Sequence, residues 1–166
     1  MKLPQVRNER DRRVLPHDEA RLLEHADPVM AAIIVLAIET AMRRSELIGL
    51  NWSDVGPTYA RLRDTKNGRP RVVPLSTRAR ASLPTRGDGR VFDIHVDTVS
   101  HRFQDLCNLA GLSDVRFHDL RHEGTSRLFE KGLSMMEVAT ITGHRSLSML
   151  QRYAHLQIDE LAAKLG

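Results

Sequence analysis

Aromatic residues, cysteine and long apolar runs are all scarce in this sequence. Phe, Trp and Tyr make up 4% of its 166 residues, which disfavours base stacking on single-stranded nucleic acid as a main binding mode. The single cysteine, Cys107, excludes an internal disulfide and suits a reducing compartment. Because Leu106 precedes it, we expect a small core residue rather than a reactive thiol. The most apolar run, residues 29–38, is about half the length that crosses a bilayer, so it predicts a buried core helix.

The overall composition is that of one globular domain with a modest excess of positive charge. Hydrophobic residues make up 41% and charged residues 28%, which is ordinary for a soluble fold. The 25 Lys and Arg exceed the 21 Asp and Glu, for a net charge of +4, and this weakly favours a polyanionic partner. Residues 1–13 are polar and basic, unlike a signal peptide. We interpret them as a linker or arm, followed by one domain over residues 14–166.

Capping residues and apolar spacing predict a mainly helical chain. Asp27 followed by Pro28 is typical of a helix start, Ser134 with Glu137 forms a capping box, and Gly111 suits a helix end. Ser76 and Asp97 are further candidate N-caps. The predicted helices cover residues 18–25, 27–42, 45–50, 76–83, 97–111, 117–131, 146–155 and 158–165, with one more opening at residue 134.

One short segment has strand character instead. Residues 59–63 alternate with period two, residues 71–75 do so in part, and Asn67-Gly68 lies between them. Asn-Gly between two such runs predicts a β-hairpin, with Lys66 at its turn. The predicted fold class is therefore mainly α with a small antiparallel β-sheet (α+β).

His118, Arg121 and His122 lie at spacings of three and four on one predicted helix, so they share a face. An arginine and histidines on one face suit phosphate binding and proton transfer; a solvated helix start carrying a histidine pair fits about as well. Two histidines one turn apart also resemble a zinc motif. That motif needs Glu in second place, where this chain has Asp119, and Arg121 would set a cation beside the metal.

Three other segments carry candidate groups, and each has an ordinary structural alternative. Arg43 follows the apolar helix and Glu46 could orient it, although a basic patch at a helix end is also favoured by the helix dipole. Lys66 at a hairpin tip is more often a solubilising residue. Tyr153, nine residues after His144, could be a half-buried structural tyrosine. Taken singly, none of these residues decides the function.

The joint order of these residues resembles the catalytic domain of the tyrosine recombinases, the family of phage-type integrases. The resemblance runs from Leu15 to the C-terminus, with residues 40–47 similar to the first arginine box and His122 in the usual position after the second arginine. It implies the integrase catalytic-domain fold. The implied catalytic positions are Arg43, Lys66, His118, Arg121, His144 and Tyr153, with Glu46 and His122 in support.

The resemblance also implies a mechanism. The tyrosine would attack a DNA phosphodiester and form a 3′-phosphotyrosyl link, while Arg43, Arg121 and His144 neutralise the phosphate oxygens. His118 would manage the tyrosine proton and Lys66 would protonate the leaving 5′ oxygen. No metal or other cofactor is expected. A type IB topoisomerase, which relaxes DNA with the same chemistry, and an inactive DNA-binding module are the alternatives.

The expected partner is double-stranded DNA, with self-association into a tetrameric synapse through the C-terminal helix at residues 158–165. The implied location is cytoplasmic and nucleoid-associated, without membrane contact. Two positions depart from the family pattern: Ala41 replaces a common glycine, and Leu150 replaces a frequent threonine. Family members also carry an N-terminal core-binding domain, which we expect to be absent from this chain.

Overall fold

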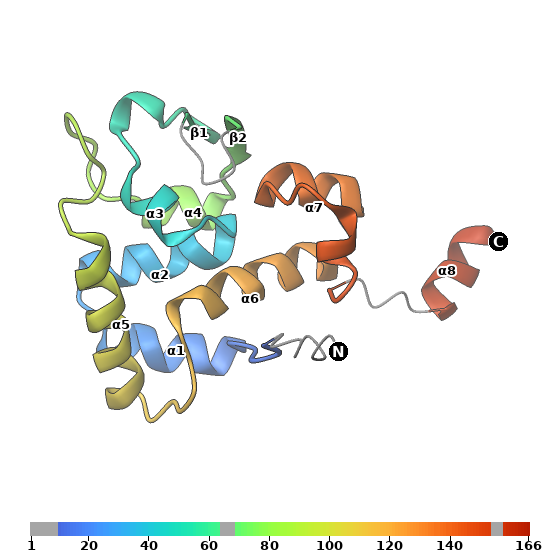
Figure 1. The fold of residues 1–166 in the computed structure, drawn as a ribbon, viewed down its shortest axis with the longest axis horizontal. Coiled ribbons are helices and arrows are strands. Elements are labelled where there is room, and N and C mark those ends of the chain that lie inside the picture. The colour runs from blue at the N-terminus through green and yellow to red at the C-terminus, as the bar shows by residue number, and fades with distance from the viewer. Residues whose placement is uncertain (1–9, 64–68, 154–157) are drawn as a thin grey trace, which may run out of the picture.

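The computed structural model describes residues 10–63, 69–153 and 158–166. Helices dominate, and one two-stranded antiparallel sheet lies beside them (Figure 1), which confirms the predicted fold class. The elements in chain order are α1 (Pro16–His25), α2 (Pro28–Thr40), α3 (Arg44–Ile48), the 3-10 helix η1 (Trp52–Asp54), β1 (Tyr59–Leu62), β2 (Arg71–Pro74), α4 (Thr77–Ser82), α5 (Val96–Leu109), α6 (Phe117–Glu130), α7 (Met135–Thr142), the 3-10 helix η2 (Leu147–Leu150) and α8 (Ile158–Leu165).

Helix α2 is the centre of the core. The Asp27 carboxylate accepts hydrogen bonds from the N–H groups of Val29 and Met30 at 3.0 and 3.1 Å, as the predicted N-cap requires. Most of the side chains of α2 are buried, and the helix packs against α1, α3, α4, α5 and α6. No helix within the described ranges is long and apolar enough to span a membrane.

Helix α2 ends at Thr40, two residues before its predicted end. Ala41 takes the left-handed conformation with φ of +51°, and the N–H of Met42 donates to the Thr40 hydroxyl at 3.3 Å. A left-handed residue stops the helical hydrogen-bond ladder. The chain therefore turns at Ala41, and this turn places Arg43 at the start of α3.

Helix α6 crosses α2 at close range. A Cβ atom built on Gly124 would lie 2.3 Å from the carbonyl oxygen of Ile38 and 3.3 Å from the Cα of Ala41. No other residue type fits such a backbone approach without movement. Gly124 therefore lets the middle of α6, which carries Arg121, lie against the end of α2.

The hairpin lies where it was predicted, with slightly shorter strands. In the antiparallel register Tyr59 pairs with Pro74 and Leu62 with Arg71. Ala60 and Val73 are buried, so the sheet has one face on the core. The turn that would hold Lys66 lies outside the described residues.

Several further helix boundaries differ from the predictions; α1 begins at Pro16 instead of residue 18, and α3 ends at Ile48 instead of residue 50. The N-cap of α5 is His95 instead of Asp97, because the His95 Nδ1 accepts from the Asp97 N–H at 3.3 Å. Helix α6 ends one residue early, at Glu130. The predicted helix over residues 146–155 is instead the four-residue η2 followed by a turn as far as Tyr153. Hydroxyl side chains in its first turn compete with the backbone, and those of Ser146 and Ser148 lie 2.6 Å apart.

Other local predictions are confirmed. The hydroxyl of Ser76 accepts from the Ala79 N–H at 3.0 Å, and Ser134 forms the predicted capping box with Glu137. Gly111 takes the left-handed conformation after α5, with φ of +66°. Cys107 is fully buried, and its burial raises the thiol pKa to about 11.

The described part of the basic N-terminal segment, residues 10–13, lies along α6. Arg10 bonds to Asp119 with both Nε and Nη2, at 3.1 and 3.0 Å. Arg13 bonds to Glu123 in the same two-pronged way, at 2.6 and 3.0 Å. The Asp119 and Glu123 carboxylates are about 1% exposed. These paired charges fix residues 10–13 against the helix that carries Arg121.

Candidate active site

Arg43 is held at the N-terminus of α3 by Glu46. The Glu46 carboxylate accepts from the Arg43 N–H at 2.8 Å and from its Nη1 at 3.0 Å. The same carboxylate receives Nη1 and Nη2 of Arg71, from β2, at 2.7 and 2.9 Å. Burial opposes ionisation of Glu46, but the bonds from Arg71 and Arg43 outweigh it and lower its pKa. One buried carboxylate thus orients two arginines.

Arg121 is 4% exposed and carries its positive charge in the interior. Its Nη1 donates to the carbonyl oxygen of Ala41 and its Nη2 to that of Thr142, at 2.9 Å. Burial first, and then the charge of Arg43, lower the pKa of Arg121 to about 10. The guanidinium therefore stays charged at neutral pH. A bound anion would offset the free-energy cost of burying this charge.

His144 follows α7 and contacts Thr142. Its Nδ1 lies 2.6 Å from the Thr142 hydroxyl. Burial, followed by the charges of Arg121 and Arg43, lowers the pKa of His144 to about 4. The ring is therefore neutral at pH 7, and an incoming negative charge would raise this pKa because it would offset the two arginines.

Tyr153 lies in the turn after η2, packed between rings. Its hydroxyl is within hydrogen-bond distance of Nδ1 of His122. Its ring stacks on Phe129 with centroids 6.4 Å apart, and the guanidinium of Arg152 lies 4.9 Å from its centroid. Burial raises the pKa of Tyr153, although the charges of Arg152 and Arg121 oppose that rise.

His118 lies one turn before His122 on α6. The two rings meet edge-to-face, with centroids 4.7 Å apart and an interplanar angle of 90°. Burial and then the charge of Arg121 lower the pKa of His118. The imidazole within hydrogen-bond distance of the Tyr153 hydroxyl is that of His122. His118 contacts the His122 ring and not the tyrosine hydroxyl.

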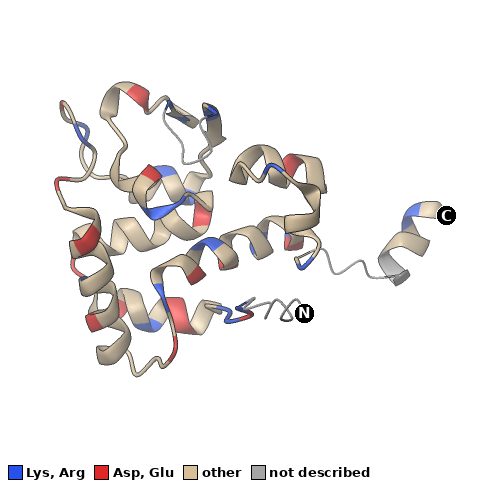
Figure 2. Cartoon of the chain, viewed as in Figure 1, with Lys and Arg blue, Asp and Glu red and all other residues tan. Residues whose placement is uncertain are grey.

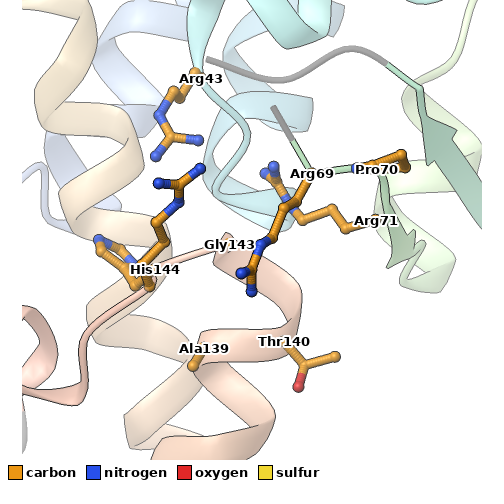
Figure 3. A pocket seen from close by; sticks show the side chains of 9 residues that line it. Arg43, Arg69, Pro70, Arg71, Ala139, Thr140, Gly143 and His144 are labelled. Carbon is orange, nitrogen blue, oxygen red and sulfur yellow. The ribbon is translucent and has the colours of Figure 1, made fainter. Parts of the chain in front are cut away.

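A cavity of about 320 Å³ opens beside Arg43 and His144, between α3, the hairpin and α7. Figure 3 shows Arg43, Arg69 and His144 around it. Basic and acidic residues are both spread over the molecule (Figure 2), whereas the charged side chains that line this cavity are all arginines. The lining residues are Arg43, Arg69, Pro70, Arg71, Ala139, Thr140, Gly143, His144 and Arg145.

The structure brings five of the six predicted catalytic positions together. The charge of Arg121 acts on His118, His144 and Tyr153, and that of Arg43 acts on Arg121. The sixth position, Lys66, lies outside the described residues. Among residues 10–63, 69–153 and 158–166, no three His, Cys, Asp or Glu side chains form a group that could hold a metal ion.

Three residues of this site were not singled out from the sequence. Arg71 pairs with Glu46, which lies 25 positions earlier in the sequence. The Thr142 carbonyl oxygen accepts from Arg121, and the Thr142 hydroxyl lies beside Nδ1 of His144. Nη2 of Arg152 lies 3.0 Å from Nδ1 of His122. For Arg152, the neighbouring tyrosine was a signal. Arg71 and Thr142 lie in ordinary strand and helix patterns, so only packing reveals them.

Residues 12–160 match the model of the phage integrase family. The chain belongs to the phage integrase family. A shufflon-specific DNA recombinase from Escherichia coli is 42% identical over 98% of this chain and 44% of its own length. The integrase of Salmonella phage P22 is 27% identical over 97% of this chain and 48% of its own length. The chain therefore spans about half the length of these two relatives.

The catalytic domain of bacteriophage HP1 integrase has a similar structure. It superposes with a TM-score of 0.77 at 27% identity, over 92% of each chain. The predicted membership of the tyrosine recombinases and the integrase catalytic-domain fold are thereby confirmed. The chain thus has the fold of a phage integrase catalytic domain, and within it the positive charges of Arg121 and Arg152 act on Tyr153.

Proposed function

We propose that this domain cleaves and rejoins double-stranded DNA as a site-specific recombinase, through a 3′-phosphotyrosyl link at Tyr153. The observation that carries the proposal is the position of Arg121, a buried cation whose charge acts on Tyr153 and His144 together. A tyrosine is a weak nucleophile at neutral pH. It becomes effective where fixed positive groups stabilise the charge that develops on phosphorus-bound oxygens.

In this mechanism the scissile phosphate sits beside Arg43, Arg121 and His144. The two guanidinium groups donate to the non-bridging oxygens, and His144 adds a third hydrogen bond. Lys66 gives a proton to the departing 5′ oxygen. Religation reverses these steps when a 5′ hydroxyl attacks the phosphotyrosine.

Covalent capture tests the proposal directly. The chain is incubated in EDTA with randomised nicked duplexes and resolved on a denaturing gel. We expect a slower protein–DNA band that Tyr153→Phe abolishes without loss of duplex affinity. The sequence has two tyrosines, so Tyr59→Phe is a matched control that keeps the band. A band that survives Tyr153→Phe, or no band with the unaltered chain, would contradict the proposal.

The DNA products distinguish recombination from the two alternative functions. Exchange of strands between two duplex sites supports a recombinase, whereas relaxation of supercoiled DNA without exchange supports a type IB topoisomerase. Binding without cleavage supports an inactive DNA-binding module. Because phosphate contacts dominate such binding, affinity should fall steeply with salt concentration.

Self-association on DNA through α8 is part of the proposal. Helix α8 stands apart from the remaining elements in Figure 1, and its Leu161 and Leu165 side chains are 38% and 87% exposed. Apolar side chains at helical spacing suit packing on a neighbouring subunit. Deletion of residues 158–166 should therefore reduce assembly on DNA, measured by analytical ultracentrifugation, and leave single-site binding intact.

A further inference from the structure

His122 presents one ring nitrogen to two neighbours at once. Nδ1 lies within hydrogen-bond distance of the Tyr153 hydroxyl, and Nη2 of Arg152 lies 3.0 Å from the same nitrogen. An arginine side chain has donors and no acceptor. Nδ1 must therefore carry its lone pair, which puts the ring proton on Nε2. It follows that the Tyr153 hydroxyl donates its proton toward Nδ1.

The surroundings of His122 hold this ring in place. His118 meets it edge-to-face on one side, and the Tyr153 ring lies 6.0 Å away at 26° on the other. Arg152 is itself anchored, because its Nη2 also donates to the carbonyl oxygen of Arg10 at 2.9 Å. The lone pair of Nδ1 thus faces the tyrosine hydroxyl in a contact that several elements define.

We propose that His122 is a catalytic residue that takes the phenolic proton of Tyr153 during strand cleavage, an inference that rests on the proposed function. The Tyr153 oxygen forms its bond to phosphorus as the bond to the 5′ oxygen breaks. The phenolic proton moves to Nδ1 and makes His122 an imidazolium, while the 5′ oxygen leaves with a proton from Lys66. Religation returns both protons.

The pKa values of His122 and Tyr153 support a proton transfer that takes place only when DNA is bound. Burial, His118 and Arg152 lower the pKa of His122 to about 4, and burial raises that of Tyr153. In the free protein the proton therefore stays on the phenol. A phosphate anion beside Arg121 would offset the positive charges that disfavour an imidazolium. Proton transfer is thereby coupled to the arrival of the substrate, and the tyrosine is unreactive without it.

Variants of His122 distinguish between two roles of this residue, namely accepting the phenolic proton and only positioning Tyr153. In His122→Asn an amide oxygen can accept the Tyr153 hydrogen bond but does not take up a proton. We expect single-turnover formation of the covalent adduct to fall about 100-fold, with unchanged duplex affinity. Imidazole added to His122→Ala should restore part of the rate. The exposed His25 provides the control variant His25→Gln, for which we expect the unaltered rate.

The outcomes are distinct. A His122→Asn rate within about threefold of the unaltered chain, with no imidazole rescue of His122→Ala, would overturn the role of His122 and leave the proposed function standing. Absence of any Tyr153-dependent adduct would instead defeat the proposed function.

Nitrogen NMR tests the contact without DNA cleavage. We expect His122 in the free protein to be the neutral Nε2–H tautomer, with an Nδ1 resonance that shifts in Tyr153→Phe. A protonated Nδ1, or one that does not respond to Tyr153→Phe, would overturn the inference whatever the activity of the chain.

Discussion

Nη1 of Arg121 donates to the carbonyl oxygen of Ala41, the residue that ends α2 in a left-handed conformation. The turn is therefore more than a helix stop, because its carbonyl orients the buried guanidinium. A left-handed backbone is unfavourable for residues with a Cβ atom by roughly 1 kcal/mol or more. The chain tolerates this cost with the smallest side chain after glycine, fully buried against Val138 and Leu150.

Two substitutions at Ala41 should have unequal effects. Ala41→Gly relieves the backbone but loses a buried methyl group, so we expect the free energy of unfolding to change by less than about 1 kcal/mol. Ala41→Val adds a branched side chain in a left-handed, buried site and should cost more than about 2 kcal/mol. Urea denaturation measures both. Equal losses would contradict a conformational origin.

Gly124 should be equally sensitive to size. Gly124→Ala would place a methyl group 2.3 Å from the Ile38 carbonyl oxygen, so α6 must move away from α2. We expect a loss of about 1–3 kcal/mol in the free energy of unfolding, despite the better helix propensity of alanine. Ser126→Ala on the same helix is the control and should change stability by less than about 0.5 kcal/mol. A stabilised Gly124→Ala would show that the two helices are not in close contact.

Glu46 should matter for both stability and cleavage because it orients Arg43 and Arg71. Arg71 also donates from Nε to the Ile141 carbonyl oxygen at 3.0 Å, so it joins α3, the hairpin and α7. Glu46→Gln removes the charge that both arginines share and should cost about 3–5 kcal/mol. Arg71→Lys loses the two-pronged geometry and should slow adduct formation about tenfold.

A surface ion pair provides the comparison for these variants. Arg63 pairs with Asp54 at 2.6 Å, but its side chain is 67% exposed. Arg63→Lys should therefore change the free energy of unfolding by less than about 1 kcal/mol. If Arg71→Lys is as mild as Arg63→Lys in both denaturation and adduct formation, the Glu46–Arg71 pair does not position the site.

Sequence patterns were enough to predict those parts of the fold that depend on neighbouring residues. The N-caps at Asp27, Ser76 and Ser134 follow from local hydrogen bonding. The pairing of β1 with β2 was expected from two alternating runs close together in the sequence. The cap of α5 was wrong by two residues because a histidine nitrogen replaced the expected carboxylate.

The site was predictable as a set of residues but not as a set of contacts. Spacing placed His118 and His122 on one face, and only the turn after η2 determines that His122 meets the tyrosine. The Arg152–Arg10 contact joins residues 142 positions apart. Such pairs depend on how the elements pack, so no local pattern contains them.

Stability should fall as the pH is lowered from 7 to 5, because His122 and His144 are neutral in the folded protein. Their pKa values of about 4 lie below the unfolded value of about 6.5, so the unfolded chain binds more protons in this range. By linkage the free energy of unfolding then decreases toward acid, by about 2 kcal/mol for the pair after allowance for partial exposure. The carboxylates with lowered pKa values, such as Glu46, contribute only at lower pH. Urea denaturation at several pH values measures the slope. The double variant with His122→Gln and His144→Gln should lose most of it, whereas an unchanged slope would place its origin in other groups.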